Sequence, residues 1–298
     1  MKIAIAGGNG FVGKALQSHL LEHQHEVFIL TRNTKPYSPM EGVTYVNWLN
    51  GRDQPELQLE GVEAIINLAG ESLNSGRWST ARKSRILNSR LSATKEINRI
   101  IAVLQHKPSV LLNASAVGYY GTSHTETFTE QQQMKPSDFL SDTVDQWEQE
   151  ASNSGIRTVL MRFGVILGEH EGALPRMVLP YKLYGGGTIG SGKQMLSWIH
   201  IDDVVRAALY CISNPSIVGP VNFTAPNPVN MKVFGQMIGK VLHRPHWMPV
   251  PAFMLQLLLG EMSILILEGQ TILPSSLLEH GFFFSYPTLE NALQELLT

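Results

Sequence analysis

Residues 1 to 32 read MKIAIAGGNGFVGKALQSHLLEHQHEVFILTR, and this stretch sets the architecture of the chain. Lys2 to Ala6 is a short apolar run, typical of a buried parallel strand. A turn with three glycines follows, then a helical pattern that ends before the second apolar run, Val27 to Leu30. A strand, a glycine turn, a helix and a strand within about thirty residues form the smallest unit that binds a dinucleotide.

The three glycines, at positions 7, 10 and 13, have separate roles in such a turn. Gly7 allows the tight turn, Gly10 lets backbone N–H groups approach a pyrophosphate, and Gly13 lets the helix pack against the strand. The pyrophosphate then lies on the helix N-terminus, where unpaired N–H groups and the helix dipole favour an anion. We therefore predict a nucleotide site at this turn.

The end of the second strand indicates which dinucleotide is bound. It carries Thr31 and Arg32, and no acidic residue follows until Glu41. An acid there would accept hydrogen bonds from a ribose 2′-hydroxyl, whereas a guanidinium suits a 2′-phosphate and stacks on adenine. The sequence therefore favours NADP(H) over NAD(H).

Composition excludes several classes of partner. The chain has 298 residues, of which 43% are hydrophobic and 16% charged, as in an ordinary globular protein with one large or two intertwined domains. Its formal charge of −2 gives no electrostatic footprint for nucleic acid or an anionic membrane. The single cysteine, Cys211, excludes an internal disulfide and a cysteine metal cluster, and its apolar neighbours suggest a packed thiol. We expect no metal site.

Targeting features point to the cytoplasm. The chain enters a strand directly, without a basic and apolar leader, so we expect a cytoplasmic enzyme. Ala252 to Leu267 is the most apolar stretch, but it is too short to span a bilayer and is interrupted by Glu261. We interpret it as buried or partner-facing helix, with apolar helices at Ala252–Leu259 and Ile264–Leu267 that either pack on a partner or close the lid.

Strand-like and helical patterns alternate along the rest of the chain. We predict strands at 43–48, 64–68, 110–114, 158–167, 197–201 and 221–223, helices at 77–105, 138–152 and 204–213, and a polar loop at 33–39. Asp202 or Asp203 is expected to cap the helix at 204–213. The alternation predicts an α/β, Rossmann-like, doubly wound parallel sheet. We expect residues 1–167 and 193–225 to bind NADP(H), and residues 168–192 and 226–298 to form a smaller substrate-binding lid.

Two further segments are expected to face the cofactor. Leu68, Ala69 and Gly70 end an apolar strand with small residues, which lets the backbone pass close to the cofactor ribose. Glu71 either faces the site or caps the next helix. Within an arginine series on that helix, Arg90 is expected to point inward.

Several motifs together resemble the extended short-chain dehydrogenase/reductase family. They are the glycine turn at 7–13, the turn at 67–70, the strand end at Ser115 and the segment from Trp198 to Asp203. The chain more closely resembles the branch described as nucleoside-diphosphate-sugar epimerases. That likeness is carried by Leu68–Glu71, Ser89–Arg90, Gly118–Tyr120, Ile189–Gly192 and Leu267–Gln270.

The resemblance implies an NADP(H) site. Its residues here would be Gly7, Gly10, Phe11, Val12, Gly13, Thr31, Arg32, Leu68, Ala69 and Gly70. It also places Gly164, Val165 and Ile166 beside the nicotinamide ribose and amide. Arg90 stands where relatives outside the branch carry an Asn near the cofactor, and an arginine there can reach a cofactor phosphate or a substrate acid.

The family's chemistry rests on Ser, Tyr and Lys, and this chain departs from that set. Ser115 fits the Ser that hydrogen-bonds the reacting oxygen, four residues before Tyr119. The Tyr-x-x-x-Lys pair is missing, because residues 138–143 read DFLSDT and no Tyr or Lys occurs from 137 to 157. Three interpretations stay open: Tyr119 or Tyr120 supplies the acid, Ser115 acts with water, or the chain binds NADP(H) without turnover. His200 is either a general base or a hydrogen-bonded core residue.

These observations predict an NADP(H)-dependent oxidoreductase or epimerase acting on a small polar, sugar-nucleotide-like substrate. Ser115 would anchor the oxygen and Tyr119 would supply the proton. Reduction is favoured over epimerisation, because loss of the Tyr/Lys pair most impairs deprotonation of an unactivated alcohol. The alternative is a non-catalytic NADP(H)-binding regulatory protein. We expect a monomer or homodimer.

Overall fold

A seven-stranded parallel sheet forms the centre of the computed structural model, which describes residues 1–34 and 40–298; most of the loop predicted at 33–39 lies outside them. The strand order is β11-β7-β5-β4-β1-β2-β3, and every pairing is parallel. The strands are β1 (Lys2–Ala6), β2 (Glu26–Thr31), β3 (Val43–Asn47), β4 (Ala64–Asn67), β5 (Val110–Ala116), β7 (Thr158–Phe163) and β11 (Gly219–Phe223). The predicted doubly wound sheet is confirmed.

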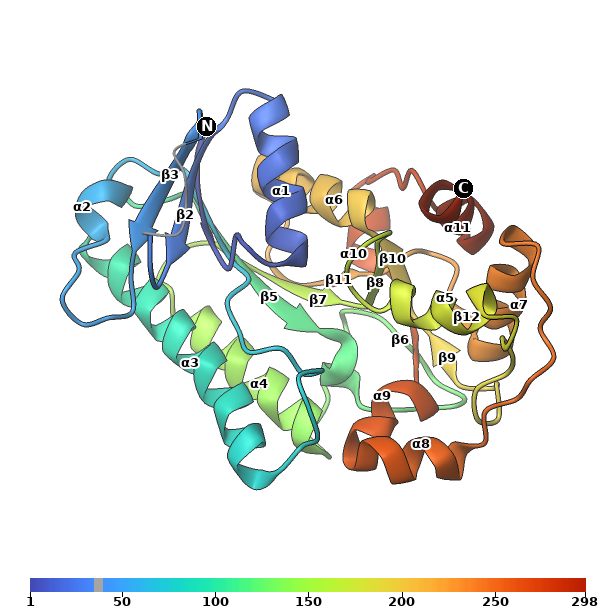
Figure 1. Ribbon diagram of the computed structural model, residues 1–298. Helices are drawn as coiled ribbons and strands as arrows, with labels where there is room; N and C mark the ends of the chain where they lie inside the picture. Colours follow the sequence, from blue (N-terminus) through green and yellow to red (C-terminus); the bar gives the residue numbers. More distant parts are fainter. Residues whose placement is uncertain (35–39) are drawn as a thin grey trace.

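Helices cover both faces of this sheet. The helices α1 (Phe11–Glu22) and α6 (Ile201–Ser213) pack on one face, and α3 (Thr80–Val103) and α4 (Phe139–Ser152) on the other (Figure 1). Successive β1 side chains serve the two faces, since Ile3 and Ile5 join one core while Ala4 and Ala6 join the other. The short helix α2 (Glu56–Leu59) packs beside α3.

Cys211 belongs to the α1–α6 core. Its side chain is fully buried, and burial raises the pKa of the thiol to about 12. The predicted packed thiol is confirmed.

The strand predicted at 158–167 is broken at Gly164. Its first part is β7 in the main sheet, and its second part, β8 (Val165–Leu167), pairs instead with β10 (Trp198–His200). A Cβ at Gly164 would lie 2.5 Å from the Ser197 carbonyl oxygen and 2.9 Å from Thr224 Cγ2. The chain therefore leaves the sheet where only glycine fits.

The cap of α6 differs from the prediction. His200 is the N-cap, with Nδ1 accepting from the Asp202 N–H at 3.1 Å, whereas both aspartates lie in the first turn. The ring is 1% exposed, and its Nε2 lies 2.8 Å from Glu295 on α11 (Leu289–Leu297). These contacts favour the core interpretation of His200. The buried Asp203 carboxylate instead accepts from the N–H groups of residues 285 and 286 and so fastens the C-terminal segment.

A second core lies away from the sheet. Tyr181, Trp198, Phe234 and Leu293 pack there between α5 (Leu174–Lys182), α7 (Met231–Val241) and α11. Of the shorter elements, β9 (Met195–Leu196) and β12 (Val229–Asn230) join this core. A separate small cluster is formed by η1 (Val117–Tyr120), β6 (Thr127–Phe128) and β13 (Thr271–Ile272), and α10 (Ser275–Glu279) packs on the main-sheet core. The division into a cofactor domain and a lid at residues 167 and 168 stays a prediction.

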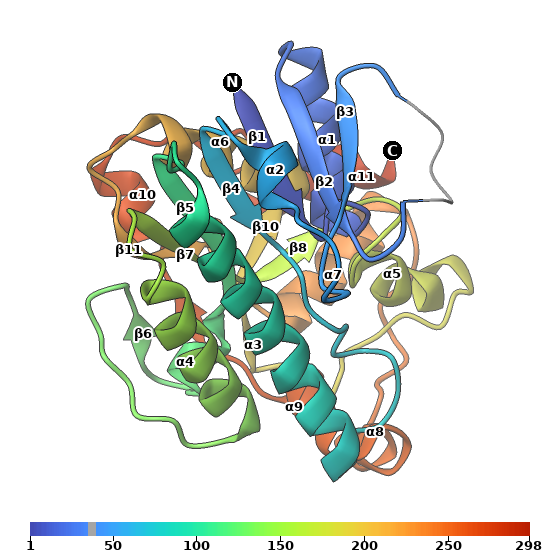
Figure 2. The same cartoon turned by 90° about the vertical axis from the view of Figure 1, so that its left-hand side faces the viewer.

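The apolar stretch from 252 to 267 forms two short helices. They are α8 (Ala252–Leu259) and α9 (Ile264–Leu267), joined by η2 (Gly260–Ser263), and the break falls at Gly260 with φ +60°. Neither α8 nor α9 has a fully buried residue, so the expectation of a buried helix is wrong. Both lie at the N-terminal end of α3 (Figure 2). Within the described chain, no helix is long and apolar enough to cross a membrane.

Candidate cofactor and substrate site

The glycine turn between β1 and α1 holds two glycines that the fold itself requires. Gly7 has φ +79°, and a Cβ there would lie 2.9 Å from the Leu68 backbone. A Cβ at Gly13 would lie 2.5 Å from the Gly7 carbonyl oxygen. Gly10 differs, because its φ is −84° and a Cβ would come no closer than 3.4 Å to any other group. The packing of the protein therefore leaves space at Gly10.

The N-terminus of α1 has open backbone donors beside this space. Gly10 is its N-cap and offers no side chain to the first N–H groups, and the first turn has no acid. The Phe11 ring fits against the loop at 168–172, since a Cβ at Gly168 would lie 2.5 Å from it. Lys14 Nζ meets Glu171 Oε1 at 2.7 Å on the same loop, and Val12 packs against the α1–α6 core. An anion at this helix end would be favoured by the dipole.

The strand ends next to this turn carry the other predicted cofactor residues. Thr31 is the last residue of β2, and Arg32 follows it with an exposed side chain. Leu68, Ala69 and Gly70 follow β4. Gly164 separates β7 from β8, where Val165 and Ile166 are half-buried. Parallel strands place these C-terminal ends along one edge of the sheet, as ligand binding in open α/β folds requires.

A buried amide network, missed in the sequence, links the end of β4 to the middle of β5. Asn67 Nδ2 donates to Asn113 Oδ1 at 2.7 Å and to Thr94 Oγ1 at 3.1 Å, and its Oδ1 accepts from the Ala69 N–H. Trp147 Nε1 also donates to Thr94 Oγ1, at 3.0 Å. The only sequence sign is an asparagine at the end of two neighbouring buried strands.

Glu71 and Arg90 meet at the turn after β4. Glu71 does not cap α3, because Ser79 is the N-cap; its carboxylate instead pairs with Arg82 Nη1 at 2.6 Å. Arg90 points inward as predicted, with Nη1 donating to the carbonyl oxygens of Glu71 and Ile86. Burial lowers the pKa of Arg90 to about 10. Both hydrogen-bond acceptors of Arg90 are neutral carbonyl oxygens, so no carboxylate neutralises its positive charge through these bonds, and the guanidinium can attract an anion.

Ser115 belongs to a second buried network, which links β5, α4 and β7. Its hydroxyl donates to Glu148 Oε1 at 2.5 Å, and Arg162 holds the same carboxylate through Nε at 2.8 Å and Nη2 at 2.7 Å. Arg162 Nη1 also donates to Tyr120 Oη at 2.9 Å. Burial opposes the charge on Arg162, but hydrogen bonds to Glu148 and the attraction of that carboxylate raise its pKa above the usual value.

The two tyrosines after Ser115 differ in burial. Tyr120 is buried and donates to Asn222 Oδ1 at 2.9 Å, and burial raises the pKa of its phenol. Tyr119 is half-buried, with its ring centroid 3.5 Å from Arg162 Cζ and its hydroxyl accepting from the Met134 N–H at 3.4 Å. The structure therefore brings Ser115 and Tyr119 together at one cation, Arg162.

The helix that would carry the Tyr-x-x-x-Lys pair begins at Phe139. Asp138 and Ser141 form a capping box there, which explains the polar residues on either side of the phenylalanine. The Phe139 ring packs edge-on against Trp78 at 5.3 Å, and Lys83 Nζ lies 5.3 Å above it. Thr143, buried on the next turn, has no hydrogen-bond partner for its hydroxyl. Phe139 and Thr143 thus stand where the family resemblance implies the catalytic tyrosine and its lysine.

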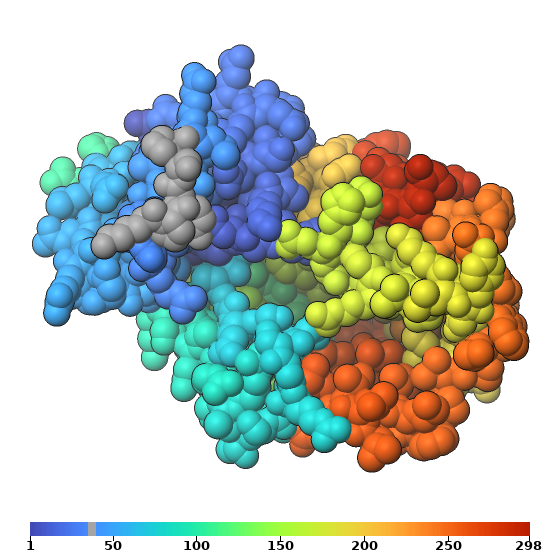
Figure 3. Space-filling view, in the orientation of Figure 1, coloured from blue at the N-terminus to red at the C-terminus, as the bar shows by residue number. Residues whose placement is uncertain are grey.

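A recess opens at the centre of the molecule. Figure 3 shows it between the N-terminal segment, the region around residues 70–85, the segment near 165–190 and the helices near 250–265. Its outer rim is bridged where Arg77 donates to the Leu257 and Leu258 carbonyl oxygens and where Lys83 meets Glu261 at 2.5 Å. These segments carry the predicted cofactor residues on one side and the predicted lid on the other.

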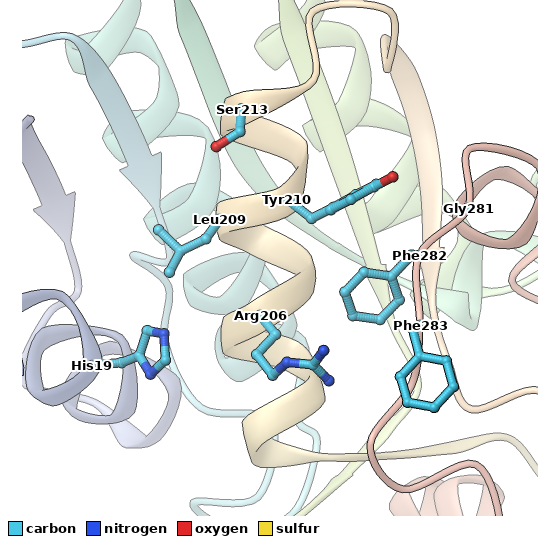
Figure 4. Close-up of a pocket in the computed structure, with 8 residues that line it drawn as sticks. All are labelled: His19, Arg206, Leu209, Tyr210, Ser213, Gly281, Phe282 and Phe283. Atoms are coloured by element: carbon cyan, nitrogen blue, oxygen red, sulfur yellow. The ribbon is translucent and has the colours of Figure 1, made fainter. Parts of the chain in front are cut away.

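A separate open groove of about 440 Å³ lies beside α6. It is lined by His19, Arg206, Leu209, Tyr210, Ser213, Gly281, Phe282 and Phe283 (Figure 4). Arg206 points across it toward Phe282 but is already held by Asp203 Oδ1 at 2.9 Å. None of the predicted site residues lines this groove.

The sheet order and the glycine turn define a Rossmann-like α/β protein of the short-chain dehydrogenase/reductase type. The chain belongs to the NAD dependent epimerase/dehydratase family, whose model matches residues 3–223. A second model, for a domain of unknown function (DUF1731), matches residues 250–296.

Relatives cover the whole chain. Epimerase family protein YfhF of Bacillus subtilis is 50% identical over 100% of this chain and 98% of its own length. An epimerase family protein of Staphylococcus haemolyticus is 44% identical over 98% of each. The crystal structure of human epimerase family protein SDR39U1 (isoform 2) with NADPH is similar, with a TM-score of 0.88 and 32% identity over 99% of both chains. MoeE5 in complex with UDP-glucose and NAD, at 18% identity, 98% and 96% coverage and a TM-score of 0.77, shares the fold.

Proposed function

We propose that the chain is an NADP(H)-dependent oxidoreductase that acts on a carbonyl or hydroxyl group of a small molecule. The observation that supports this most is the turn at 7–13. Gly10 leaves space that the protein does not fill, directly at an α1 N-terminus with open donors. The family model for NAD dependent enzymes and the similarity to a protein crystallised with NADPH support the same proposal.

Individual residues are proposed to hold separate parts of NADP(H). Gly10, Phe11 and Val12 would present N–H groups to the pyrophosphate, and Arg32, exposed after β2, would pair with the 2′-phosphate. The backbone of residues 68–70 would pass the ribose. Arg90, whose hydrogen bonds go to neutral carbonyls, would reach a cofactor phosphate or a substrate acid.

Replacing Arg32 by alanine should weaken NADPH binding about tenfold or more and leave NADH binding little changed. The expected loss is that of one charge-assisted contact to the 2′-phosphate, about 1.5–3 kcal/mol. Fluorescence titration of wild type and Arg32→Ala with both nucleotides measures it. Arg52→Ala is a matched control, because Arg52 is also exposed and lies outside the predicted site. Equal binding of both nucleotides by the wild type would contradict the NADP(H) assignment.

The chemistry proposed for this site needs a hydride and a proton. When bound, NADPH would supply a hydride for the carbonyl carbon. Ser115 Oγ would hold the reacting oxygen, and Tyr119, packed on Arg162, would deliver the proton to it. Ser115 donates its one proton to Glu148 and can accept from a substrate hydroxyl; to hold a carbonyl oxygen, its O–H would turn from Glu148 and donate to that oxygen.

Replacing Ser115 by alanine should lower the rate of NADPH oxidation with a responsive carbonyl compound by about a hundredfold. NADPH affinity should stay unchanged. The fold should survive, because Glu148 keeps both hydrogen bonds from Arg162. Rates are measured by the loss of NADPH absorbance. If the protein binds NADPH but does not oxidise it with any carbonyl compound, the result would instead support a non-catalytic regulatory role. The observation that favours this second candidate function is the missing Tyr/Lys pair.

A further inference from the structure

The α8–α9 side of the recess carries no positive charge. From Pro245 to Thr298 the sequence has no Lys or Arg, and its acids are Glu261, Glu268, Glu279, Glu290 and Glu295. A nucleoside diphosphate brings two phosphate charges, which proteins bind with arginine, lysine or helix N-termini. The helices at this rim, α8 and α9, bring no cation to an anion, and the nearby Glu261 is paired with Lys83.

The cations on the facing rim are already engaged. Lys83 pairs with Glu261, and Arg82 pairs with Glu71. Arg77 donates to two backbone carbonyl oxygens at the end of α8. At the floor, Arg162 is held by Glu148. Arg90, like Arg77, donates only to neutral carbonyl oxygens, and α5 adds Arg176 and Lys182 with exposed side chains.

Apolar side chains lie on these segments and at the start of α4, which packs against Trp78. Trp78 and Phe139 pack edge-on and are half-buried, and Leu140 lies next to Gly118, where a Cβ would be 3.6 Å away. Gln256 is the one polar residue of α8, and α9 reads ILIL. Phe253 is 67% exposed and Leu257 75% exposed. Phe139 is notable because it stands where the family resemblance predicts the catalytic tyrosine.

From this charge and surface distribution, we infer that the recess accepts an uncharged, largely apolar carbonyl compound rather than a nucleoside-diphosphate sugar. The inference rests on the proposed function, since it names the second substrate of that hydride transfer. Burial of the substrate's methylene groups against Trp78, Phe139 and the helices α8 and α9 would provide its affinity. A sugar diphosphate would instead bring its charge to the α8–α9 side, which has no cation, and to Arg82 and Lys83, which are already paired with glutamates.

The test measures binding to NADP⁺-loaded protein, which cannot turn over a ketone. Isothermal titration is carried out with methyl ketones from butanone to decanone and with UDP-glucose. Each added methylene should tighten ketone binding about fourfold until the recess is filled. UDP-glucose should show no saturation in the same concentration range. A flat ketone series, or UDP-glucose binding tighter than decanone, overturns the inference.

Two variants test whether the ketones bind in the recess. Phe139→Ser should weaken decanone binding about tenfold, because it removes a large apolar contact. Phe283→Ser is the matched control, since Phe283 is 77% exposed and lines the separate groove, and it should bind decanone as the wild type does. Equal affinity in wild type and Phe139→Ser would place the ketones elsewhere and overturn the inference.

The two proposals fail in different ways. Ketones that bind as expected to protein that never oxidises NADPH with them would remove the proposed hydride transfer and leave the apolar recess standing. NADPH oxidation or epimerisation seen only with UDP-sugars would keep the proposed function and remove the apolar substrate.

Discussion

Arg162→Leu should lower the free energy of unfolding by about 3–5 kcal/mol, the largest stability effect expected in this chain. The substitution leaves the Glu148 carboxylate, 7% exposed, without the two hydrogen bonds and the charge that compensate its burial. It also removes the donor to Tyr120 and the cation on the Tyr119 ring. Urea unfolding followed by far-ultraviolet circular dichroism measures the change.

Two further variants test whether the loss of stability comes from the unpaired Glu148 carboxylate. Arg99→Leu removes an ion pair with Glu56 and Glu96 in which the arginine side chain is 43% exposed, and should cost less than about 1 kcal/mol because solvent screens it. The double variant Glu148→Leu/Arg162→Leu should recover much of the loss, because both charges are gone. A loss in Arg162→Leu no greater than that in Arg99→Leu would show that the buried pair does not stabilise the fold.

The main sheet could be predicted because each of its strands has a local sequence pattern. Continuous apolar runs such as residues 64–68 and 110–114 are typical of strands buried on both faces, and the glycine turn fixes where the first one ends. The break at Gly164 could not be seen in this way. It depends on the approach of Ser197 and Thr224, which are distant in sequence. The His200 cap was missed because aspartate is the commoner N-cap residue.

The candidate site was predictable to the extent that it consists of contiguous motifs. Gly7 and Gly13 have the steric roles assigned to them, and Arg90 faces the turn at Gly70. The pairing of Ser115 with Glu148 was not predicted, since the two residues lie on different elements and no short motif links them. The consequence matters for function. A serine that would contact substrate is held by a carboxylate that is itself neutralised, so its orientation depends on Arg162.

Gly10→Ala and Gly13→Ala should have opposite consequences, although each adds a single methyl group to the same turn. At Gly13 the methyl would lie 2.5 Å from the Gly7 carbonyl oxygen and 2.6 Å from the Gly8 backbone, so the helix must move away. We expect a loss of about 1–3 kcal/mol in the free energy of unfolding, as for overpacked cores.

At Gly10 the methyl meets nothing closer than 3.4 Å, and φ of −84° suits alanine. The lower entropy of the unfolded chain offsets the poorer N-cap, so stability should change by less than about 1 kcal/mol. NADPH affinity should nevertheless fall about tenfold or more, because the methyl occupies the space where the pyrophosphate would approach the backbone. Thermal unfolding and fluorescence titration of both variants measure the two effects separately. Unchanged NADPH binding in Gly10→Ala would show that the dinucleotide does not lie on the α1 N-terminus, whatever the stability of Gly13→Ala.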